Sequence, residues 1–414
     1  MINQAINRLR NLYSVKWAAV AGALLTAMMI LAPKSVAGVL VLGVLVSIFV
    51  VSRTVALQAA LAHAARRPEN IGIALLAGVI LVSVEWHFSG EISYASALNT
   101  AMILGGGVLS MLWWQCAESI PSSQCQEIGI GIAVGVSLGT FGLWVAYGYA
   151  ALSGDSLWGD YYYDPLSPLN NSAVMLALFI WPAVTVRTQL SVWWMALLVL
   201  PTLGVLALLS SAAALSAALI GILIFVVRRV TGQRIAVAMV FILVFIAMAA
   251  PYGIKSSSVA AFVPTKEDIA SNSSALAPSF QHRLVMWSFV ADRIDERPWL
   301  GWGFDASRVI PQEAYRLAPN MEIMPLHPHN LSLQTRLELG IPGVLVVGIL
   351  MIAVLVPLTR YADSKFISGV MLASAIGWIF IANVSFGMWQ TWWVSTAFVL
   401  ANFMRICVRS RDEV

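Results

Sequence analysis

Long apolar runs recur along most of the chain, and they limit what it can fold into. The 414 residues are 59% hydrophobic and only 11% charged, whereas soluble domains carry about 25% charged residues. A β-barrel would alternate polar and apolar positions, so these runs predict an all-α polytopic membrane protein. About twelve runs cross or nearly cross a bilayer: 17–32, 36–52, 71–84, 95–115, 128–150, 172–186, 192–209, 211–227, 234–250, 341–358, 366–384 and 390–407.

Basic residues indicate how these helices are oriented, because cytoplasmic loops are enriched in Lys and Arg. With a cytoplasmic N-terminus, the even-numbered connections are cytoplasmic, and all but one of them carry the bases. These are Arg53, Arg66, Arg67, Arg187, Arg228, Arg229, Arg234, Arg360 and Lys365. The connection 116–127 is the exception, with two Glu and no base. We therefore expect both termini in the cytoplasm, and an uncleaved first span rather than a signal peptide.

This orientation places the one long polar stretch outside. We divide the chain into helices one to nine at 1–250, an external loop and catalytic segment at 251–340, and helices ten to twelve at 341–414. The external segment ends in unusually polar sequence. If a helix starts near Pro328, one face carries His327, Asn330, Gln334 and Glu338, and a second stripe carries His329, Ser332 and Arg336. Such a helix either lines a site or lies at the interface with its polar face solvated.

The stretch His-Pro-His-Asn-Leu-x-Leu-Gln-x-x-x-Glu-x-Gly-x-x-Gly at 327–343 resembles the hallmark of a known family. It is similar to the O-antigen ligase and O-antigen polymerase family of bacterial membrane glycosyltransferases. There a His-Asn pair precedes a helix ending in Glu-x-Gly-x-x-Gly. The motifs Arg283-Leu284-x-x-Trp287 and Pro298-x-x-Gly301-x-Gly303 also match, and the resemblance covers roughly residues 155–345.

The resemblance implies a multi-pass glycosyltransferase of the bacterial inner membrane with its site facing the periplasm. Its donor would be a glycan on an undecaprenyl-pyrophosphate carrier, and the acceptor a sugar hydroxyl. We favour an O-antigen ligase acting on lipid A-core in lipopolysaccharide biosynthesis. The alternative is a polymerase that uses a carrier-linked repeat as acceptor. We expect membrane lipids as further partners, with no nucleic acid and no cofactor.

The same resemblance, together with side-chain chemistry, gives the expected site. His329 and Arg283 are the expected catalytic residues, with His329 acting either as a base or as a phosphate ligand. Arginine binds phosphate oxygens in a bidentate manner. The expected pyrophosphate-binding residues are Arg308, Arg316, His327 and Asn330, and the expected supporting residues are Gln334 and Glu338. No metal site is expected, because the chain has no Asp-x-Asp pair.

One position departs from the family pattern. Where the family usually has Ser-Arg, at a tight turn between two apolar helices, this chain has Ser211-Ala212. We expect Arg308 or Arg316 to replace the missing arginine. A secondary transporter remains the alternative from another class, since twelve spans suit such folds. The concentration of polar residues in one external segment argues against it.

Overall fold

The computed structural model describes residues 2–54, 57–89, 94–112, 122–157, 164–186, 192–209, 211–255, 263, 278–312, 323–324, 326–360 and 364–409. These residues form α-helices joined by turns and short 3-10 segments, and the described residues contain no strand. The α-helices are α1 (Ile2–Leu31), α2 (Val36–Thr54), α3 (Leu57–Ala65), α4 (Pro68–Ser83), α5 (Tyr94–Ser110), α7 (Ser122–Ser153), α8 (Asn170–Thr185), α9 (Val192–Leu208), α10 (Ala212–Val230), α11 (Gln233–Ile254), α14 (Pro278–Glu296), α15 (Leu331–Leu358), α16 (Lys365–Val384) and α17 (Thr391–Arg409).

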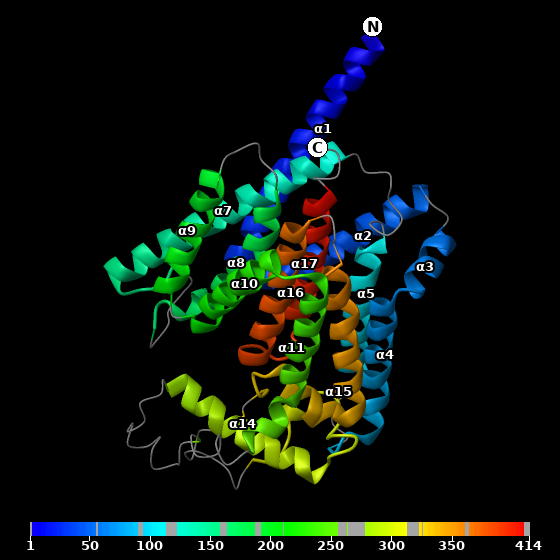
Figure 1. The fold of residues 1–414 in the computed structure, drawn as a ribbon, viewed down its shortest axis with the longest axis vertical. Coiled ribbons are helices and arrows are strands. Elements are labelled where there is room, and N and C mark those ends of the chain that lie inside the picture. Colours follow the sequence, from blue (N-terminus) through cyan, green and yellow to red (C-terminus); the bar gives the residue numbers. More distant parts are fainter. Residues whose placement is uncertain are drawn as a thin grey trace.

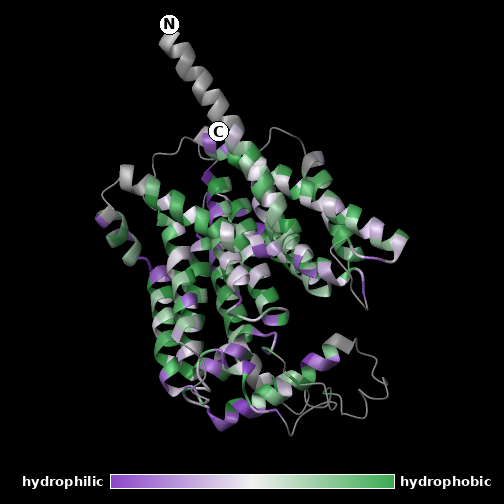
Figure 2. Ribbon diagram, turned by 180° about the vertical axis from the view of Figure 1, so that it is seen from behind, coloured by the Kyte–Doolittle hydropathy of each residue, from purple (hydrophilic) through white to green (hydrophobic). Residues whose placement is uncertain are grey.

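Each predicted apolar run coincides with a helix, so the all-α polytopic class is confirmed. Seven helices of the described part are long and apolar enough to cross a membrane, and four shorter apolar helices accompany them. Twelve complete spans therefore stay a prediction. Figure 2 shows hydrophobic residues along the bundle and hydrophilic ones gathered toward its two ends.

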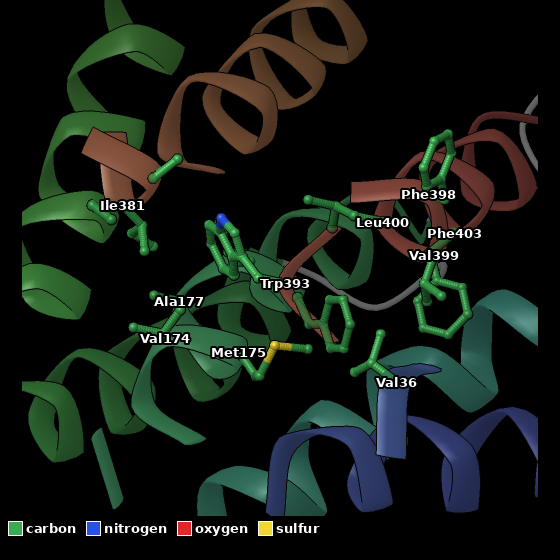
Figure 3. Close-up of a cluster of buried hydrophobic side chains, with 14 of the residues drawn as sticks. Val36, Val174, Met175, Ala177, Ile381, Trp393, Phe398, Val399, Leu400 and Phe403 are labelled. Atoms are coloured by element: carbon green, nitrogen blue, oxygen red, sulfur yellow. The ribbon is translucent and has the colours of Figure 1, made fainter. Parts of the chain in front are cut away.

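The bundle packs around α8, in which every residue from Ser172 to Ala183 is buried. Trp393 of α17 is fully buried, and Figure 3 shows it among Met175 and Val174 of α8 and Ile381 of α16. In a bilayer the lipid tails are themselves apolar, so close van der Waals packing rather than transfer from water stabilises such contacts.

Small residues let α1 and α7 approach closely. A β-carbon at Gly131 would meet the Ala19 backbone, one at Gly135 would meet Ala23, and one at Gly139 would meet Ile30. Residue numbers rise together along both helices, so α1 and α7 run in parallel, as the predicted topology requires for two odd-numbered spans. Glycines four residues apart are a common device for close helix packing in membranes.

A second, smaller layer covers one end of the bundle. Helix α14 lies there, at the end opposite the start of α1 and the end of α17 (Figure 1). Its inner face packs with the first turns of α15 in a separate apolar cluster that includes Met286, Phe289, Leu333 and Leu337. This layer and the adjoining loops position the candidate site.

Helix α15 consists of two parts separated at Gly340, whose φ of 62° is non-helical. A β-carbon there would lie 2.2 Å from the Trp299 carbonyl oxygen, so only glycine fits. The first part, Leu331 to Leu339, is buried along its whole length. The kink lies at the end of the predicted 251–340 segment, whose boundaries otherwise stay a prediction.

Two expectations about this stretch are wrong. The helix begins at Leu331 rather than near Pro328, and His327 lies outside it. The reason is local: His329 takes a left-handed φ of 50°, which a helix cannot continue through. The interfacial alternative also fails, because Ser332, Gln334, Arg336 and Glu338 are all buried rather than solvated.

Candidate functional site

Asn330 fixes where the polar helix begins. Its side-chain oxygen accepts a hydrogen bond from the Leu333 N–H at 2.9 Å, which is the usual geometry of an N-cap. The preceding residue is held by α14, since the Trp287 indole donates to the Pro328 carbonyl oxygen at 2.8 Å. The tryptophan of the Arg-Leu-x-x-Trp motif thus positions the loop that carries both histidines.

His329 presents one ring nitrogen to the protein and leaves the other available. Its Nδ1 contacts the Ser385 carbonyl oxygen. A carbonyl can only accept, so Nδ1 carries the proton, and in the neutral ring Nε2 then holds the lone pair. No described residue bonds Nε2. Burial lowers the pKa of His329, and the nearby Arg283 and His282 add to this effect, so the neutral form dominates near pH 7.

The ring of His327 contacts the ring of His329. The two rings are 4.3 Å apart and nearly perpendicular, and the Nε2 of His327 lies 3.1 Å from the Gln390 amide nitrogen. Gly387 makes room for this ring, because a β-carbon there would lie 2.5 Å from Cδ2 of His327. Burial lowers the pKa of His327 to about 3, so it stays neutral.

Glu338 joins three segments that are distant in sequence. Its buried carboxylate accepts from the Asp305 N–H at 3.0 Å, from the Gln334 amide at 3.1 Å, from the Ser307 hydroxyl and from the Trp389 indole. Four donors saturate a carboxylate. Glu338 therefore holds these segments together, and the supporting role expected for it stays a prediction.

Gln334 makes a second connection within the same region. Its side-chain oxygen accepts from the Met388 N–H at 2.8 Å while its amide nitrogen donates to Glu338. Both polar ends of the side chain are thus occupied. The loop between α16 and α17 is held against the polar helix at the position where its Ser385 reaches His329.

The Pro-x-x-Gly-x-Gly motif ends the polar helix. The Trp302 N–H donates to the Leu337 carbonyl at 2.8 Å and the Gly303 N–H to the Glu338 carbonyl at 2.9 Å. Gly301 and Gly303 have φ of 74° and 98°, and a β-carbon on Gly301 would lie 2.6 Å from the Leu337 oxygen. Glycines are required here because the backbone approaches the helix end directly.

The arginines expected in the site differ in their burial and in whether they already pair with described residues. Arg283 of α14 is half-buried, burial lowers its pKa, and it has no hydrogen bond or ion pair with a described residue. Arg308 is exposed and pairs with Asp305 at 2.7 Å. Its charge also acts on His327. Arg316 lies outside the described residues.

Several residues in this region were not expected from the sequence. Asn383 accepts from the Ser332 hydroxyl at 2.9 Å, and Ser385 and Gln390 contact the two histidines. The signal that could have identified them is a short, glycine-containing turn between two apolar runs, on the side predicted to be external. Arg336, which the sequence placed only on the second stripe, is buried within the same helix.

An apolar cavity of about 390 Å³ leads away from the site, between α4, α5, α15, α16 and α17. Met388 and Trp389 line its end near Glu338, while Arg67 and Arg405 line the opposite end. The volume falls in the range typical of ligand pockets, about 300–1,000 Å³. Apolar walls suit a hydrocarbon chain.

Comparison with known proteins agrees with the resemblance. Residues 196–348 match the family model described as O-antigen ligase. This stretch includes α10, α14, the polar helix and all the described site residues up to Gly343.

Curated relatives point the same way. A protein of Rickettsia conorii named as a candidate polysaccharide ligase is 33% identical over 147 residues, which is 34% of this chain and 36% of that protein. Proteins of Rickettsia felis and Rickettsia prowazekii with the same kind of name are 32% and 35% identical over 146 and 140 residues. The chain therefore matches about a third of the length of these relatives.

Proposed function

We propose that this protein, whose residues 196–348 match the family model described as O-antigen ligase, is a membrane glycosyltransferase with a polyprenyl-pyrophosphate-linked donor. One observation carries the proposal: His329 holds its Nδ1 against the Ser385 carbonyl and leaves Nε2 available beside the half-buried Arg283. A neutral imidazole next to an unpaired guanidinium suits a reaction that needs both a base and an anion ligand.

The chemistry follows from these two groups. The Nε2 of His329 takes the proton of an acceptor hydroxyl as the oxygen attacks the anomeric carbon of the donor sugar. A new glycosidic C–O bond forms, the C–O bond to the pyrophosphate breaks, and its electron pair leaves with the pyrophosphate. Arg283 stabilises the negative charge of that leaving group.

The proposal also includes the other expected donor ligands. Arg308 reaches the site from the short helix at 306–308, where Asp305 holds it. The oxygen of the Asn330 amide is used by the N-cap, so its nitrogen remains for a phosphate oxygen. Buried His327 serves best by orienting its neighbour through the contact of the two rings. Arg316 is proposed from the sequence alone.

A lipid carrier fits the apolar cavity. A polyprenyl chain entering between α15 and α17 would lie against side chains such as Leu350, Met351 and Phe398. Trp389 lines this cavity and also bonds Glu338, so it connects the chain site to the polar site. Part of an isoprenoid chain fills such a volume, and the rest would extend into the bilayer.

The acceptor defines two versions of the function. In the ligase version, which the family model and the names of the relatives favour, the acceptor is a lipid A-core sugar. In the polymerase version it is the end of another carrier-linked repeat. The proposed location is the bacterial inner membrane with the α14 layer in the periplasm.

Purified protein in lipid nanodiscs tests the proposal. Undecaprenyl-pyrophosphate glycan is supplied with lipid A-core in one reaction and with a second carrier-linked repeat in another. Transfer to lipid A-core supports the ligase version, and elongation of the carrier-linked glycan supports the polymerase version. Absence of both products, with donor present and protein folded, contradicts the proposed function.

A further inference from the structure

Arg336 is a buried cation without a visible partner. Its side chain is 6% exposed, and its Nε and Nη1 atoms are buried with no hydrogen-bond partner in the described part of the chain. No ion pair with a described acid compensates its charge. Its neighbours on the polar helix, Gln334 and Glu338, are by contrast fully bonded.

Such an arrangement is unfavourable in the empty protein. Removing a charge from water is costly unless the charge is paired and hydrogen-bonded, and buried arginines therefore normally have acidic or carbonyl partners. A guanidinium presents its donors in a planar fork that matches phosphate oxygens. A buried arginine without a partner among the described residues, on the helix that follows His329, thus points to an anion that arrives with the substrate.

The packing of α10 against α16 shows which part of α10 lies at the same end of α16 as the polar helix. A β-carbon on Gly369 would lie 3.3 Å from the Phe225 carbonyl oxygen, and one on Gly377 would lie 3.8 Å from the Ala217 oxygen. Residue numbers fall along α10 as they rise along α16, in equal steps. The two helices are therefore antiparallel with a fixed register.

Extending this register places Ser211, the N-cap of α10, level with Asn383 at the end of α16. Asn383 is the residue that accepts from Ser332 of the polar helix. Arg336 lies one turn beyond Ser332 on the same face. The start of α10, which includes Ala212, and the start of the polar helix therefore lie at the same end of α16. The resembling family has an arginine at the position of Ala212, and this chain has none.

We propose that Arg336 binds the pyrophosphate of the lipid-linked donor and replaces the cation missing at Ala212. This inference rests on the proposed function for the identity of the anion. It changes the compensation expected from Arg308 or Arg316, because Arg308 is exposed and already paired with Asp305. Arg336 acts as a donor-binding residue.

Two buried arginines make a matched experiment. Arg228 is 4% exposed, and its guanidinium donates to Ser368 Oγ at 2.8 Å and to the carbonyl oxygens of Thr359 and Thr231 at 3.2 Å each. The unfolding temperature of Arg336→Met and Arg228→Met is measured in nanodiscs without ligand. Arg228→Met should lower Tm, whereas Arg336→Met should leave it unchanged or raise it by a few degrees. A fall for Arg336→Met comparable to that of Arg228→Met contradicts the proposal.

Inorganic pyrophosphate and undecaprenyl pyrophosphate are then added to the same samples. Both should raise the Tm of the wild type, the rise should be lost in Arg336→Met and reduced in Arg336→Lys, and vesicles of phosphatidylglycerol should not replace them. If Tm rises equally in the wild type and in Arg336→Met, the assignment of Arg336 is wrong, while the proposed donor class still stands. If the wild type does not respond at all, the proposed donor class fails as well.

Turnover gives the functional result. Arg336→Met should reduce glycan transfer at least a hundredfold, mainly through a raised KM for donor, and Arg336→Lys should recover part of it. A loss that appears only in kcat, with donor KM unchanged, contradicts binding of the donor by Arg336.

Discussion

Each end of the helical bundle holds a buried arginine, and the two arginines differ in their hydrogen bonding. At the end where α10 and α15 finish, Arg228 donates to three acceptors and ties α10 to α16. At the other end, Arg336 keeps buried nitrogen atoms without described partners, and His329 keeps one ring nitrogen available. Both residues are buried arginines, so Arg228 and Arg336 differ in whether described residues make hydrogen bonds to their guanidinium groups. Removing one partner of a bonded buried cation is destabilising, whereas a buried cation that no described residue bonds is a candidate for binding a ligand.

The same contrast exists within the end of the bundle that α14 covers. Glu338 and Gln334 have every polar atom bonded, and they hold loops 305–307 and 385–390 in place. His329 contacts the second of these loops through Ser385, and His329, Arg283 and Arg336 each keep polar atoms that no described residue bonds. Substitutions of the unsaturated groups should therefore change turnover, and substitutions of the saturated ones should change stability.

The largest effect on turnover is expected at His329. His329→Ala removes the proposed base, and general bases contribute about a hundredfold or more to rate. Glycan transfer by purified protein should fall by that factor while Tm stays near wild type. His327→Ala is the matched control and should cost less, because its ring only orients its neighbour. Near-normal transfer by His329→Ala would remove this residue from the site.

A smaller effect is expected at Arg283. Arg283→Lys keeps the charge but loses the planar fork, so turnover should fall by roughly tenfold. Arg308→Lys should cost less, because Arg308 is exposed and paired with Asp305. Steady-state rates at saturating acceptor measure both. An equal loss of turnover in the two variants would show that the ion pair with Asp305 does not make Arg308 less important than Arg283.

The Glu338→Gln variant tests the residues whose side-chain polar atoms are all hydrogen-bonded. The amide replaces one acceptor oxygen by a donor that faces other donors, and each unsatisfied buried group costs about 1–3 kcal/mol. Thermal unfolding in nanodiscs should show a clear fall in Tm. Glu296→Gln is the control, since that partly exposed ion pair with Arg293 contributes about 1 kcal/mol or less. Similar Tm values for the two variants would contradict the organising role of Glu338.

The smallest effect is expected from metal removal. The proposed site neutralises pyrophosphate with arginines, so transfer measured before and after EDTA treatment should be unchanged. Loss of activity on chelation, restored by magnesium, would show that a cation rather than Arg283 and Arg336 carries this charge.

The sequence predicted much of the fold because apolar periodicity and glycines act locally. Each of the twelve apolar runs coincides with a helix of the described part, and the glycine motifs end the polar helix as backbone geometry requires. The helix start was predicted three residues early, since nothing in the composition shows that His329 takes a left-handed conformation.

Contacts between distant segments were beyond sequence reasoning. The bond from His329 to Ser385 and the bonds from Asp305 and Ser307 to Glu338 join loops that no spacing relates. The sequence alone did not distinguish Arg336 from the other arginines of the chain. It became a candidate only through its burial and its unbonded atoms.

The pH dependence of kcat/KM for donor tests the central claim, that the neutral His329 left unsaturated by the fold acts on the substrate as a base. Burial lowers its pKa below the ordinary 6.5, and His327, with a pKa of about 3, does not titrate in this range. The rate should be flat above pH 7 and should fall as the pH drops through the pKa of His329. The His329→Ala variant should lose this limb. A wild-type rate that instead falls as the pH rises from 5 to 7 would show that the charged imidazolium is the active form, and would contradict the account.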